Sequence, residues 1–314
     1  MATERLGEFE LIDAITAGLP TSPAIVLGPG DDSAVFRVEG DAAISTDAIV
    51  EGVHFRRDWS GPHDVGRKVV AAAVADLEAM GARPVTLVIA MSVPPELDQA
   101  WVLECAKGIR DECATIGIVL AGGDMTRSKE IMLTATVVGD FGGRAPVTRA
   151  GARPGDVVAV IGRLGMAAAG LAVLGRGFRS PRAVVLAFRV PEPPYGQGIV
   201  AAESGATSMI DVSDGLLADL GHIAKASGVG IDLDSSKLEV SEPQKTVAAA
   251  IGGGDPLSYI LAGGDDHALV ATFPSARVPE GWTVIGKVTD QGAGTVLVDS
   301  APWTGPTGYQ HFSR

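Results

Sequence analysis

The sequence predicts a protein of the α/β class, with a mixed α+β arrangement in each of two domains. A chain of 314 residues is long enough for two domains or one large domain. Strand-like and helix-like segments alternate in both halves of the chain. The stretch 142–155 between the halves is rich in glycine, proline and arginine, as linkers often are. We therefore expect an N-terminal domain over residues 1–141 and a C-terminal domain over residues 142–314.

In the first half, apolar residues with helical spacing predict helices, and short apolar runs predict strands. Ile12, Ile15 and Leu19 mark a short first helix, while Gly81 and Gly117 end two longer ones. These longer helices are expected over residues 64–80 and 101–116. Strands are expected at residues 33–38, 42–46, 85–91, 118–120 and 130–139. The glycine-containing segment AGGDMTRS, residues 121–128, is expected to form a turn.

The second half follows the same alternation. Strands are expected at residues 157–161, 208–212 and 230–233, and helices at residues 166–174 and 216–227. A proline-rich link, VPEPPYG, separates the first helix of this half from the next strand. Ser213 or Asp214 is expected to cap the second helix. The segment LAGGDDHALVATF predicts a turn with a pair of acids, followed by a strand.

Charge and hydropathy exclude several classes of partner. The formal net charge is −13 and the isoelectric point is about 4.8, so the surface should repel nucleic acid and acidic membranes. It should also repel a nucleotide polyphosphate unless cations lie between them. No apolar run reaches the roughly 18–20 residues that a membrane-spanning helix needs. The N-terminus has acids where a signal peptide has bases, and we expect a cytosolic protein.

Acidic residues beside glycine or within apolar runs are the main functional signal. We expect them at strand ends or helix starts, and they are Asp31 and Asp32 in GPGDD, Asp47 in ISTD, Asp76 in VADLEAMG, Asp124 in AGGD, and Asp211 and Asp214 in IDVSDG. Divalent cations such as Mg²⁺ take oxygen ligands, mostly carboxylates and water. The chain has no G-x-x-x-x-G-K-[ST] loop. Carboxylates with several metal ions are another way to hold a polyphosphate.

Three of these positions have a more specific chemistry. Asp76 lies within the apolar stripe of its predicted helix, where a carboxylate is costly unless it is paired or bound to metal. Ser45 and Thr46 add hydroxyl and carbonyl oxygens next to Asp47. The segment 211–214 lies at a helix N-terminus, whose partial positive charge and N–H groups favour phosphate. Taken singly, each aspartate–glycine pair is equally consistent with an ordinary turn.

Together the motifs resemble those of the thiamine-monophosphate kinase family. The matching segments, in chain order, are GPGDDSAVF, ISTDAIVEGVHF, DLEAMGARP, GGDMTRS, IDVSDGLLADLGHI and LAGGDDHAL. The resemblance runs from GEFELI near residue 7 to GYQHF near residue 312, which is almost the whole chain. The wider superfamily includes aminoimidazole ribonucleotide synthetase, selenophosphate synthetase and a hydrogenase maturation factor. The HF that follows STD and the closing GYQHF favour the thiamine branch.

The resemblance implies a fold, an assembly and a reaction. The sheet of the N-terminal domain would pair with that of a second subunit to form a barrel, making a homodimer, and a C-terminal α/β domain would follow. The reaction implied is direct transfer of a phosphoryl group from ATP to thiamine monophosphate, giving ADP and thiamine diphosphate, with several Mg²⁺ ions. Such a transfer needs positioning and charge neutralisation more than an activated nucleophile.

The resemblance also implies roles for particular residues. The implied metal ligands are Asp32, Ser45, Thr46, Asp47, Asp76, Asp124, Asp211 and Asp214, of which Asp47, Asp76, Asp124 and Asp211 are implied to be catalytic. The implied ATP contacts are Gly123, Asp124, Arg149 and Ser213. The implied contacts to thiamine monophosphate are His54, Asp265 and Tyr309. Asp31 remains an alternative to Asp32.

One motif departs from the family pattern, and two rival functions remain. The family usually has Gly-Gly-Glu-Asp-Tyr where this chain has GGDDH at residues 263–267, so the first acid is one methylene shorter. A rival function is another ATP-dependent synthase of the same superfamily, which would activate an amide or similar oxygen. A second rival is a non-catalytic nucleotide-binding scaffold, although a scaffold need not keep ligands for several metals.

Overall fold

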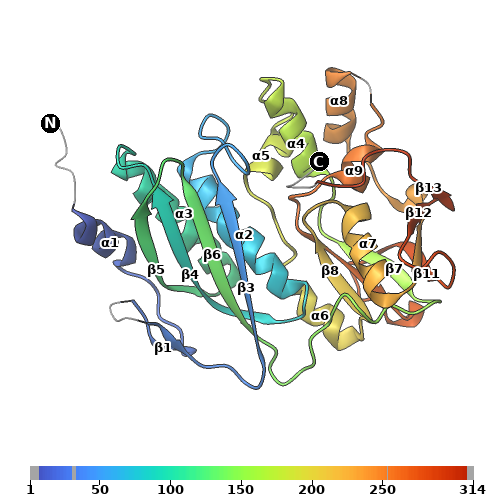
Figure 1. Ribbon diagram of the computed structural model, residues 1–314, viewed down its shortest axis with the longest axis horizontal. Coiled ribbons are helices and arrows are strands. Elements are labelled where there is room, and N and C mark those ends of the chain that lie inside the picture. Colours follow the sequence, from blue (N-terminus) through green and yellow to red (C-terminus); the bar gives the residue numbers. More distant parts are fainter. Residues whose placement is uncertain (1–6, 30–32, 253, 310–314) are drawn as a thin grey trace. The chain divides into compact units, whose positions relative to one another are not determined.

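The computed structural model describes residues 7–29, 33–252 and 254–309 of the chain, which forms two compact units. The first unit comprises Met1–Leu77 and Arg83–Arg144, and the second comprises Glu78–Ala82 and Ala145–Arg314. Both units combine helices with a β-sheet (Figure 1), which confirms the predicted α/β class. Asp31 and Asp32 lie outside the described residues.

The first unit is built on a four-stranded sheet. Its strands, in spatial order, are β3 (Ala42–Val50), β6 (Met132–Asp140), β4 (Arg83–Val93) and β5 (Val119–Arg127). Only β4 and β5 are parallel. Two helices, α2 (Pro62–Glu78) and α3 (Gln99–Ile116), cover one face of the sheet (Figure 1). The side chains beneath them, such as Leu87, Leu133 and Val137, are fully buried, so this face is the core of the unit.

Two smaller elements complete the first unit. Helix α1 (Glu8–Thr16) packs on α3, and Arg110 Nη1 donates to the carbonyl oxygen of Ile15 at 2.8 Å. Strand β1 (Ile25–Leu27) pairs with β2 (Val35–Phe36). The strand predicted over residues 33–38 is therefore only two residues long among those described. The strand predicted to end before Asp47 instead runs on to Val50, because all nine residues of β3 pair with β6.

The segment AGGD was predicted to be a turn, and this prediction is wrong. Residues 121–127 continue strand β5, where Gly123 pairs with Ile89 and Asp124 with Ala90. A Cβ atom on Gly123 would lie 2.1 Å from the carbonyl oxygen of Ile89. The glycine is thus required by close approach of two strands, and not by a turn. Asp47 and Asp124 consequently lie within strands, and Asp76 lies near the end of α2, whereas a strand end or helix start was expected for each.

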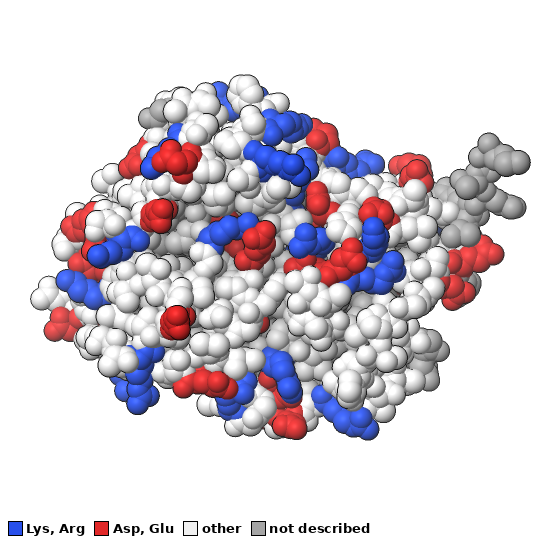
Figure 2. Space-filling model, turned by 180° about the vertical axis from the view of Figure 1, so that it is seen from behind, with Lys and Arg blue, Asp and Glu red and all other residues white. Residues whose placement is uncertain are grey.

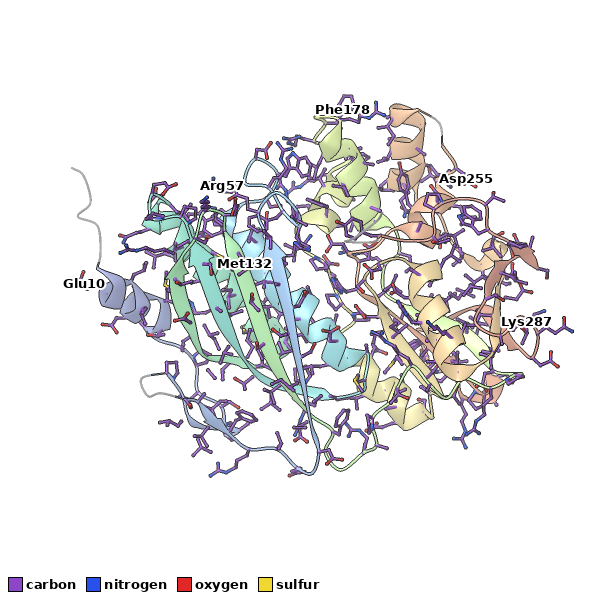
Figure 3. The ribbon with its side chains drawn as sticks, in the orientation of Figure 1. Glu10, Arg57, Met132, Phe178, Asp255 and Lys287 are labelled. Carbon is purple, nitrogen blue, oxygen red and sulfur yellow. The ribbon has the colours of Figure 1, made fainter. Side chains whose placement is uncertain are left out.

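The second face of this sheet carries exposed apolar side chains. Ile44 on β3 is 74% exposed, Val88 on β4 is 38% exposed and Met132 on β6 is 39% exposed. Figure 3 labels Met132 on this sheet. The strand register places residues 44, 46, 136, 88 and 132 on this face, alternating with the buried residues of the core. Large apolar side chains clustered on an exposed sheet face are typical of an interaction surface.

The second unit is built on a seven-stranded mixed sheet. In spatial order its strands are β13 (Ala301–Pro302), β12 (Val296–Val298), β9 (Gly230–Leu233), β11 (Thr283–Thr289), β7 (Val157–Ile161), β10 (Ala268–Phe273) and β8 (Ser208–Val212). The strands β7, β8 and β9 have the bounds predicted from the sequence. All residues of β8 and β10 are buried, so these strands form the centre of the hydrophobic core.

Helices lie around this sheet and supply the rest of the core. They are α4 (Met166–Gly175), α5 (Arg182–Arg189), α6 (Gln197–Ser204), α7 (Leu216–Ser227), α8 (Glu242–Ile251) and α9 (Leu257–Ala262), with short 3₁₀ turns at Ser235–Lys237 and Ser275–Arg277. Leu216, Leu220 and Ile223 of α7 pack in one apolar cluster with Ile260 and Leu261 of α9. Helix α7 has the predicted bounds, and α4 extends the predicted helix by one residue, whereas α5, α6, α8, α9 and strands β11–β13 were not predicted.

The segment Glu78–Ala82 belongs to the second unit because its polar groups bond there. The Glu78 carboxylate accepts hydrogen bonds from the backbone N–H groups of Gly196 and Gly198 at 2.8 and 3.0 Å. Burial raises the pKa of Glu78, while these two hydrogen bonds lower it. The Glu78 carboxylate therefore supports the first turn of α6, a position that favours negative charge.

Acidic and basic side chains are mixed on the molecular face seen in Figure 2. The excess of acidic charge is therefore not gathered into one uninterrupted patch on this face. None of the helices within the described residues is both long and apolar enough to cross a bilayer.

Candidate active site

Three of the sequence motifs meet in the second unit. The turn after β8 contains Ser213 and Asp214, and the GGDDH loop precedes β10. The backbone N–H of Asp265 donates to the carbonyl oxygen of Ser213 at 2.9 Å, and that of His267 donates to Val212 at 3.0 Å. The N–H of Tyr309 donates to the carbonyl oxygen of Asp214 at 2.9 Å. Three segments that are far apart in sequence thus form one backbone-bonded cluster.

Glycine makes this close approach possible. A Cβ atom on Gly264 would lie 2.0 Å from the carbonyl oxygen of Ser213, and one on Gly308 would lie 2.9 Å from that of Asp214. Both distances are shorter than side-chain atoms can tolerate against backbone. The glycines of GGDDH and of the closing GYQHF therefore serve to seat their loops on the turn after β8.

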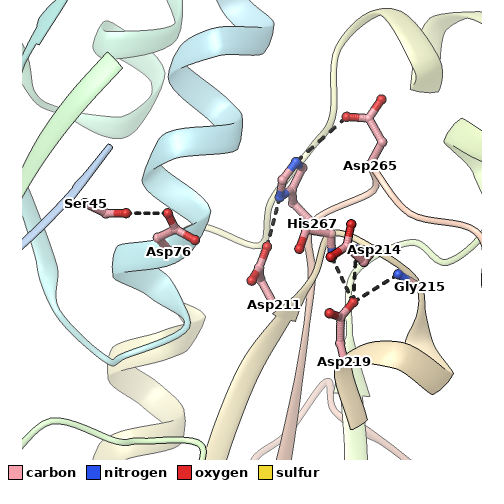
Figure 4. A network of polar contacts seen from close by, with 9 residues as sticks. Ser45, Asp76, Asp211, Asp214, Gly215, Asp219, Asp265 and His267 are labelled. Carbon is pink, nitrogen blue, oxygen red and sulfur yellow. Dashed lines mark hydrogen bonds and ion pairs between the residues drawn. The ribbon is translucent and has the colours of Figure 1, made fainter. Parts of the chain in front are cut away.

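The N-terminus of α7 is capped differently from the prediction. Its N-cap residue is Gly215, not Ser213 or Asp214. The buried Asp219 carboxylate instead accepts hydrogen bonds from the backbone N–H groups of Ser213, Asp214 and Gly215 at 3.0–3.1 Å (Figure 4). From the sequence, these N–H groups were expected to favour phosphate. In the structure they are already bonded within the chain. Burial and then the charge of Asp211 raise the pKa of Asp219 to about 7, against its backbone hydrogen bonds.

His267 lies between two of the motif aspartates (Figure 4). Its Nδ1 atom is 3.0 Å from Oδ2 of Asp211, and its Nε2 atom is 3.9 Å from Oδ1 of Asp265. His267 is 6% exposed and Asp211 is 4% exposed, so their hydrogen bond is shielded from water. Asp265 remains partly accessible to solvent.

The GGDDH loop is held in an unusual backbone conformation. Asp265 and His267 have φ angles of 68° and 54°, in the left-handed region that residues other than glycine rarely occupy. Asp266 between them is 1% exposed, and its Oδ1 accepts a hydrogen bond from the backbone N–H of Ala167 in the first turn of α4 at 3.0 Å. This bond anchors the loop and offsets its strain. Aspartate tolerates the left-handed region better than most residues, which fits the shorter acid at position 265.

Burial raises the pKa of Asp266 to about 7, against the lowering effects of the Ala167 hydrogen bond and the nearby Arg163. The unfolded chain would release this proton near pH 4, whereas the folded protein would keep it to about pH 7. The contribution of Asp266 to stability should therefore fall as pH rises from about 4 to about 7. We expect the stability of Asp266→Asn relative to the parent protein to rise over this range by up to about 4 kcal/mol.

Urea unfolding of both proteins at several pH values between 4 and 8 would measure this difference. The asparagine oxygen can still accept from Ala167, so the variant keeps the anchoring bond. Asp290→Asn, at an exposed loop position, is a suitable control for the loss of a carboxylate. Parallel stability curves for Asp266→Asn and the parent would contradict the raised pKa.

In the first unit, Ser45 and Asp76 are in direct contact. The hydroxyl of Ser45 on β3 donates to Oδ2 of Asp76 on α2 at 2.5 Å (Figure 4). Asp47, two residues further along β3, points to the same helix-covered side of the sheet, and its Oδ1 accepts from the N–H of Ala48 at 2.7 Å. These half-buried side chains are a group in the sense that they share one side of the edge strand β3. The Asp76 carboxylate is thus paired through a hydrogen bond, which is one of the two arrangements that the sequence left open for it.

Thr46 and His54 lie around this group. Thr46 points to the opposite face of β3, where its hydroxyl lies 3.1 Å from that of Thr136. The side chain of Thr46 therefore does not join those of Ser45 and Asp47. His54 follows β3, and its Nδ1 accepts from the backbone N–H of Val50 at 3.1 Å. The neutral imidazole consequently carries its proton on Nε2, where it can serve as a donor.

Gly123 and Asp124 lie at the far edge of the same sheet and line two hollows. One hollow, of about 120 Å³, is mainly apolar and lies between α1, α3 and the sheet, with Ile12, Ile15 and Ile109 among its walls. The other, of about 380 Å³, is also lined by Gly28, Pro29, Ser33 and Ala34, which flank the acidic pair of the GPGDD motif. Strands β6 and β4 separate Asp124 from β3, so Asp124 does not join the group formed by Ser45, Asp47 and Asp76.

Arg149 lies apart from Ser213, the other predicted ATP contact in the second unit. It is exposed, and its carbonyl oxygen accepts from the hydroxyl of Ser227 at the end of α7. Ser213 precedes the other end of this helix, which is 12 residues long. A helix of that length spans about 18 Å. The structure therefore does not bring Arg149 and Ser213 together. Tyr309 is exposed, and its backbone N–H bonds Asp214.

Comparison with known proteins identifies the family. Residues 30–141 match the family model "AIR synthase related protein, N-terminal domain", and residues 153–299 match the corresponding C-terminal domain. The thiamine-monophosphate kinase of Mycobacterium tuberculosis is 46% identical over 312 residues, covering 99% of this chain and 93% of that protein. The chain belongs to the thiamine-monophosphate kinase family. The resemblance inferred from the motifs is thus confirmed.

Solved structures of thiamine-monophosphate kinases have the same fold. The structure from Stenotrophomonas maltophilia K279a has a TM-score of 0.80 and 32% identity, covering 94% of this chain and 98% of that one. A structure described as AaThiL complexed with AMPPCP and TMP has a TM-score of 0.77 and 30% identity, covering 99% of this chain and 100% of that one. The likeness therefore extends over both units.

The oxygen groups of this thiamine-monophosphate kinase family member fit magnesium. No group of three or more His, Cys, Asp or Glu residues is arranged to hold a metal ion in the part of the chain that the structure describes. Mg²⁺ is usually held by one or two carboxylates together with water and substrate phosphates. The pairs Ser45–Asp76 and Asp211–His267 suit this pattern, because each orients a carboxylate through a hydrogen bond.

Sequence reasoning missed three residues of the site. Asp219 was absent from the predicted set because its position within α7 indicated only a polar helix residue. Asp266 and His267 were quoted in the motif, but no role was assigned to either. Their signal is a run of three polar residues directly before the fully buried strand β10. Such residues are expected to be buried with the strand, where polar groups need partners.

Proposed function

We propose that this protein transfers the terminal phosphoryl group of ATP to thiamine monophosphate, giving ADP and thiamine diphosphate. The observation that carries the proposal is the likeness of both units, from end to end, to a thiamine-monophosphate kinase solved with AMPPCP and TMP. The residue geometry supports it, because the motif carboxylates form oxygen-rich groups and no lysine-containing phosphate loop is present in the sequence.

The proposed reaction uses positioning and charge neutralisation. Asp32, Asp47, Asp76, Asp124, Asp211 and Asp214 would hold Mg²⁺, with the oxygens of Ser45 and Thr46. Bound Mg²⁺ would neutralise charge on the phosphates. The chain itself orients the carboxylates: Ser45 fixes Asp76, and His267 fixes Asp211. The acceptor phosphate is already an anion, so no strong base is needed, and none is assigned.

Nucleotide binding is proposed for the first unit at the Gly123–Asp124 strand segment. The apolar hollow beside Gly123 suits a planar base, because its isoleucine walls exclude water from the ring faces. The larger hollow beside Asp124 reaches the flanks of the GPGDD motif, where phosphates and cations would lie. Contacts of Arg149 and Ser213 with ATP stay predictions from the family resemblance, and the cytosolic location stays a prediction from the sequence.

A comparison of acceptors tests the proposal. Purified protein is incubated with ATP and Mg²⁺ in the presence of either thiamine or thiamine monophosphate, and ADP and the thiamine phosphates are quantified. We expect ADP and thiamine diphosphate only with thiamine monophosphate, because the cations need an acceptor phosphate to bridge. Formation of thiamine monophosphate from thiamine, or no ADP with either acceptor, would refute the proposed function.

Asp265, together with His54 and Tyr309, is proposed to contact thiamine monophosphate. The thiamine pyrimidine has N–H donors, and the solvent-accessible Asp265 carboxylate can accept from them. Such a contact binds the substrate and the transition state alike, so its loss should mainly raise KM. We expect Asp265→Ala to raise KM for thiamine monophosphate about tenfold, or about 1.4 kcal/mol, with little change for ATP. Steady-state kinetics with each substrate varied would detect this split, and an unchanged acceptor KM would reduce Asp265 to a turn residue.

A homodimer is proposed from the exposed sheet face of the first unit. Ile44, Val88 and Met132 expose apolar area that a second copy of the same face could bury. Light scattering should give a mass near twice 32.1 kDa. Ile44→Asp, which places a charge on this face at its edge strand β3, should lower that mass toward a monomer. A monomeric parent protein at micromolar concentration would exclude this assembly.

A further inference from the structure

In the second unit, a buried histidine lies between a residue proposed to bind metal and a residue proposed to bind the acceptor. The imidazole of His267 reaches Asp211, a proposed metal ligand, with Nδ1 and approaches Asp265, a proposed acceptor contact, with Nε2. A carboxylate can only accept a hydrogen bond, so the ring donates to Asp211 from Nδ1. The two contacts use different ring nitrogens, which face different acids (Figure 4).

The ring is held in place from several directions. The backbone N–H of His267 donates to Val212 at 3.0 Å, and His267 directly precedes strand β10, which pairs with β8. The neighbouring Asp266 is anchored to the first turn of α4. His267 also occupies the left-handed region, at φ 54°, which residues other than glycine seldom adopt. The ring position is therefore set by the fold, and it can in turn set the positions of other groups.

We propose that His267 is a positioning residue that orients Asp211 for metal binding and Asp265 for acceptor binding. This inference rests on the proposed function. Hydrogen-bonded partners of metal-binding carboxylates fix the direction of their lone pairs, and their loss weakens metal binding. The 3.9 Å contact to Asp265 is longer than a hydrogen bond, so it limits where that carboxylate lies without tying up its oxygens.

Two substitutions test the roles of the two ring nitrogens of His267 separately. In His267→Asn the side-chain amide nitrogen takes the place of Nδ1, and in His267→Gln it takes the place of Nε2. The asparagine variant keeps a donor toward Asp211, while the glutamine variant keeps only the side-chain amide that faces Asp265. His267→Ala removes both. His222→Asn, at an exposed position on α7, is the matched control.

Calorimetry on the full-length protein measures two binding constants in the absence of turnover. One is the Kd of AMPPCP with Mg²⁺, and the other is the Kd of thiamine monophosphate alone. We expect His267→Asn to weaken thiamine monophosphate binding about fivefold while keeping nucleotide binding near that of the parent. We expect His267→Gln to do the reverse, with an approximately tenfold loss of Mg²⁺-dependent nucleotide affinity. His267→Ala should lose both affinities.

The inference is overturned if His267→Ala binds both ligands as the parent does. It is also overturned if the asparagine and glutamine variants lose both affinities equally, which would indicate a purely structural role. Thermal melts establish that each variant is folded before binding is compared. The parent protein tests the proposed function separately, since absence of thiamine diphosphate formation by the parent would refute that function whatever the variants do.

Discussion

Asp47→Asn and Asp76→Asn should each lower kcat by about 100-fold or more and leave the protein folded. Asparagine has nearly the shape of aspartate but lacks the negative charge that Mg²⁺ requires. The Asp47 oxygen that accepts from Ala48 is retained by an amide, and Asp76 is only half-buried, so neither change opens a cavity. The two carboxylates lie at one sheet edge beside Ser45, and we expect both losses to reflect the same charge requirement.

Steady-state kinetics over a range of Mg²⁺ concentrations, with thermal melts, would measure these effects. Glu104→Gln, which removes an exposed charge from α3 in the same unit, serves as the control and should retain the parent kcat. Near-parent activity of either aspartate variant at modest Mg²⁺ would remove that residue from the proposed metal site.

Gly264→Ala should destabilise the protein by about 3 kcal/mol and impair acceptor binding. The new Cβ atom would lie 2.0 Å from the carbonyl oxygen of Ser213. Because the obstructing atom belongs to the backbone, either the GGDDH loop or the turn after β8 has to move. Either movement disturbs the hydrogen bond from Asp265 to Ser213 and shifts the Asp265 carboxylate.

Gly221→Ala is the matched control for this change. Gly221 lies in α7 of the same unit, and a Cβ atom there meets nothing within 4 Å. Alanine favours a helix over glycine, so this variant should be more stable by up to about 1 kcal/mol. Urea unfolding and the KM for thiamine monophosphate would be compared for both variants. A Gly264→Ala protein as stable as the parent would show that the two loops are not closely seated.

Elements with strong periodicity could be predicted from the sequence. Strands β7, β8 and β9 and helix α7 have the predicted bounds, because buried runs and a clear apolar face leave little choice there. The short helices α5, α6, α8 and α9 were not predicted, since helices of six to ten residues give a weak periodic signal, although α1 and α4 of similar length were recognised. Their formation depends on packing against the rest of the second unit.

Glycine and aspartate were harder to interpret, because each has both local and tertiary uses. The two glycines of AGGD suggested a turn, yet Gly123 lies in a strand where another backbone passes too close for a side chain. The aspartates of the candidate site were identified from their neighbours in sequence, but their partners were not. Ser45 bonds Asp76 across 31 positions of the sequence, and His267 bonds Asp211 across 56. Contacts between residues so far apart leave no pattern in the neighbouring sequence.

The cap on α7 has a consequence for the design of inhibitors. Three N–H groups at this helix start are occupied by Asp219, and Asp211 and Asp214 lie close by in sequence. An anionic compound aimed at the helix start would meet carboxylates in place of open donors. Compounds that bring their own hydrogen-bond donors, or that chelate a cation between themselves and these acids, are better matched to this surface. Screening libraries of phosphate mimics should therefore be tested with Mg²⁺ present.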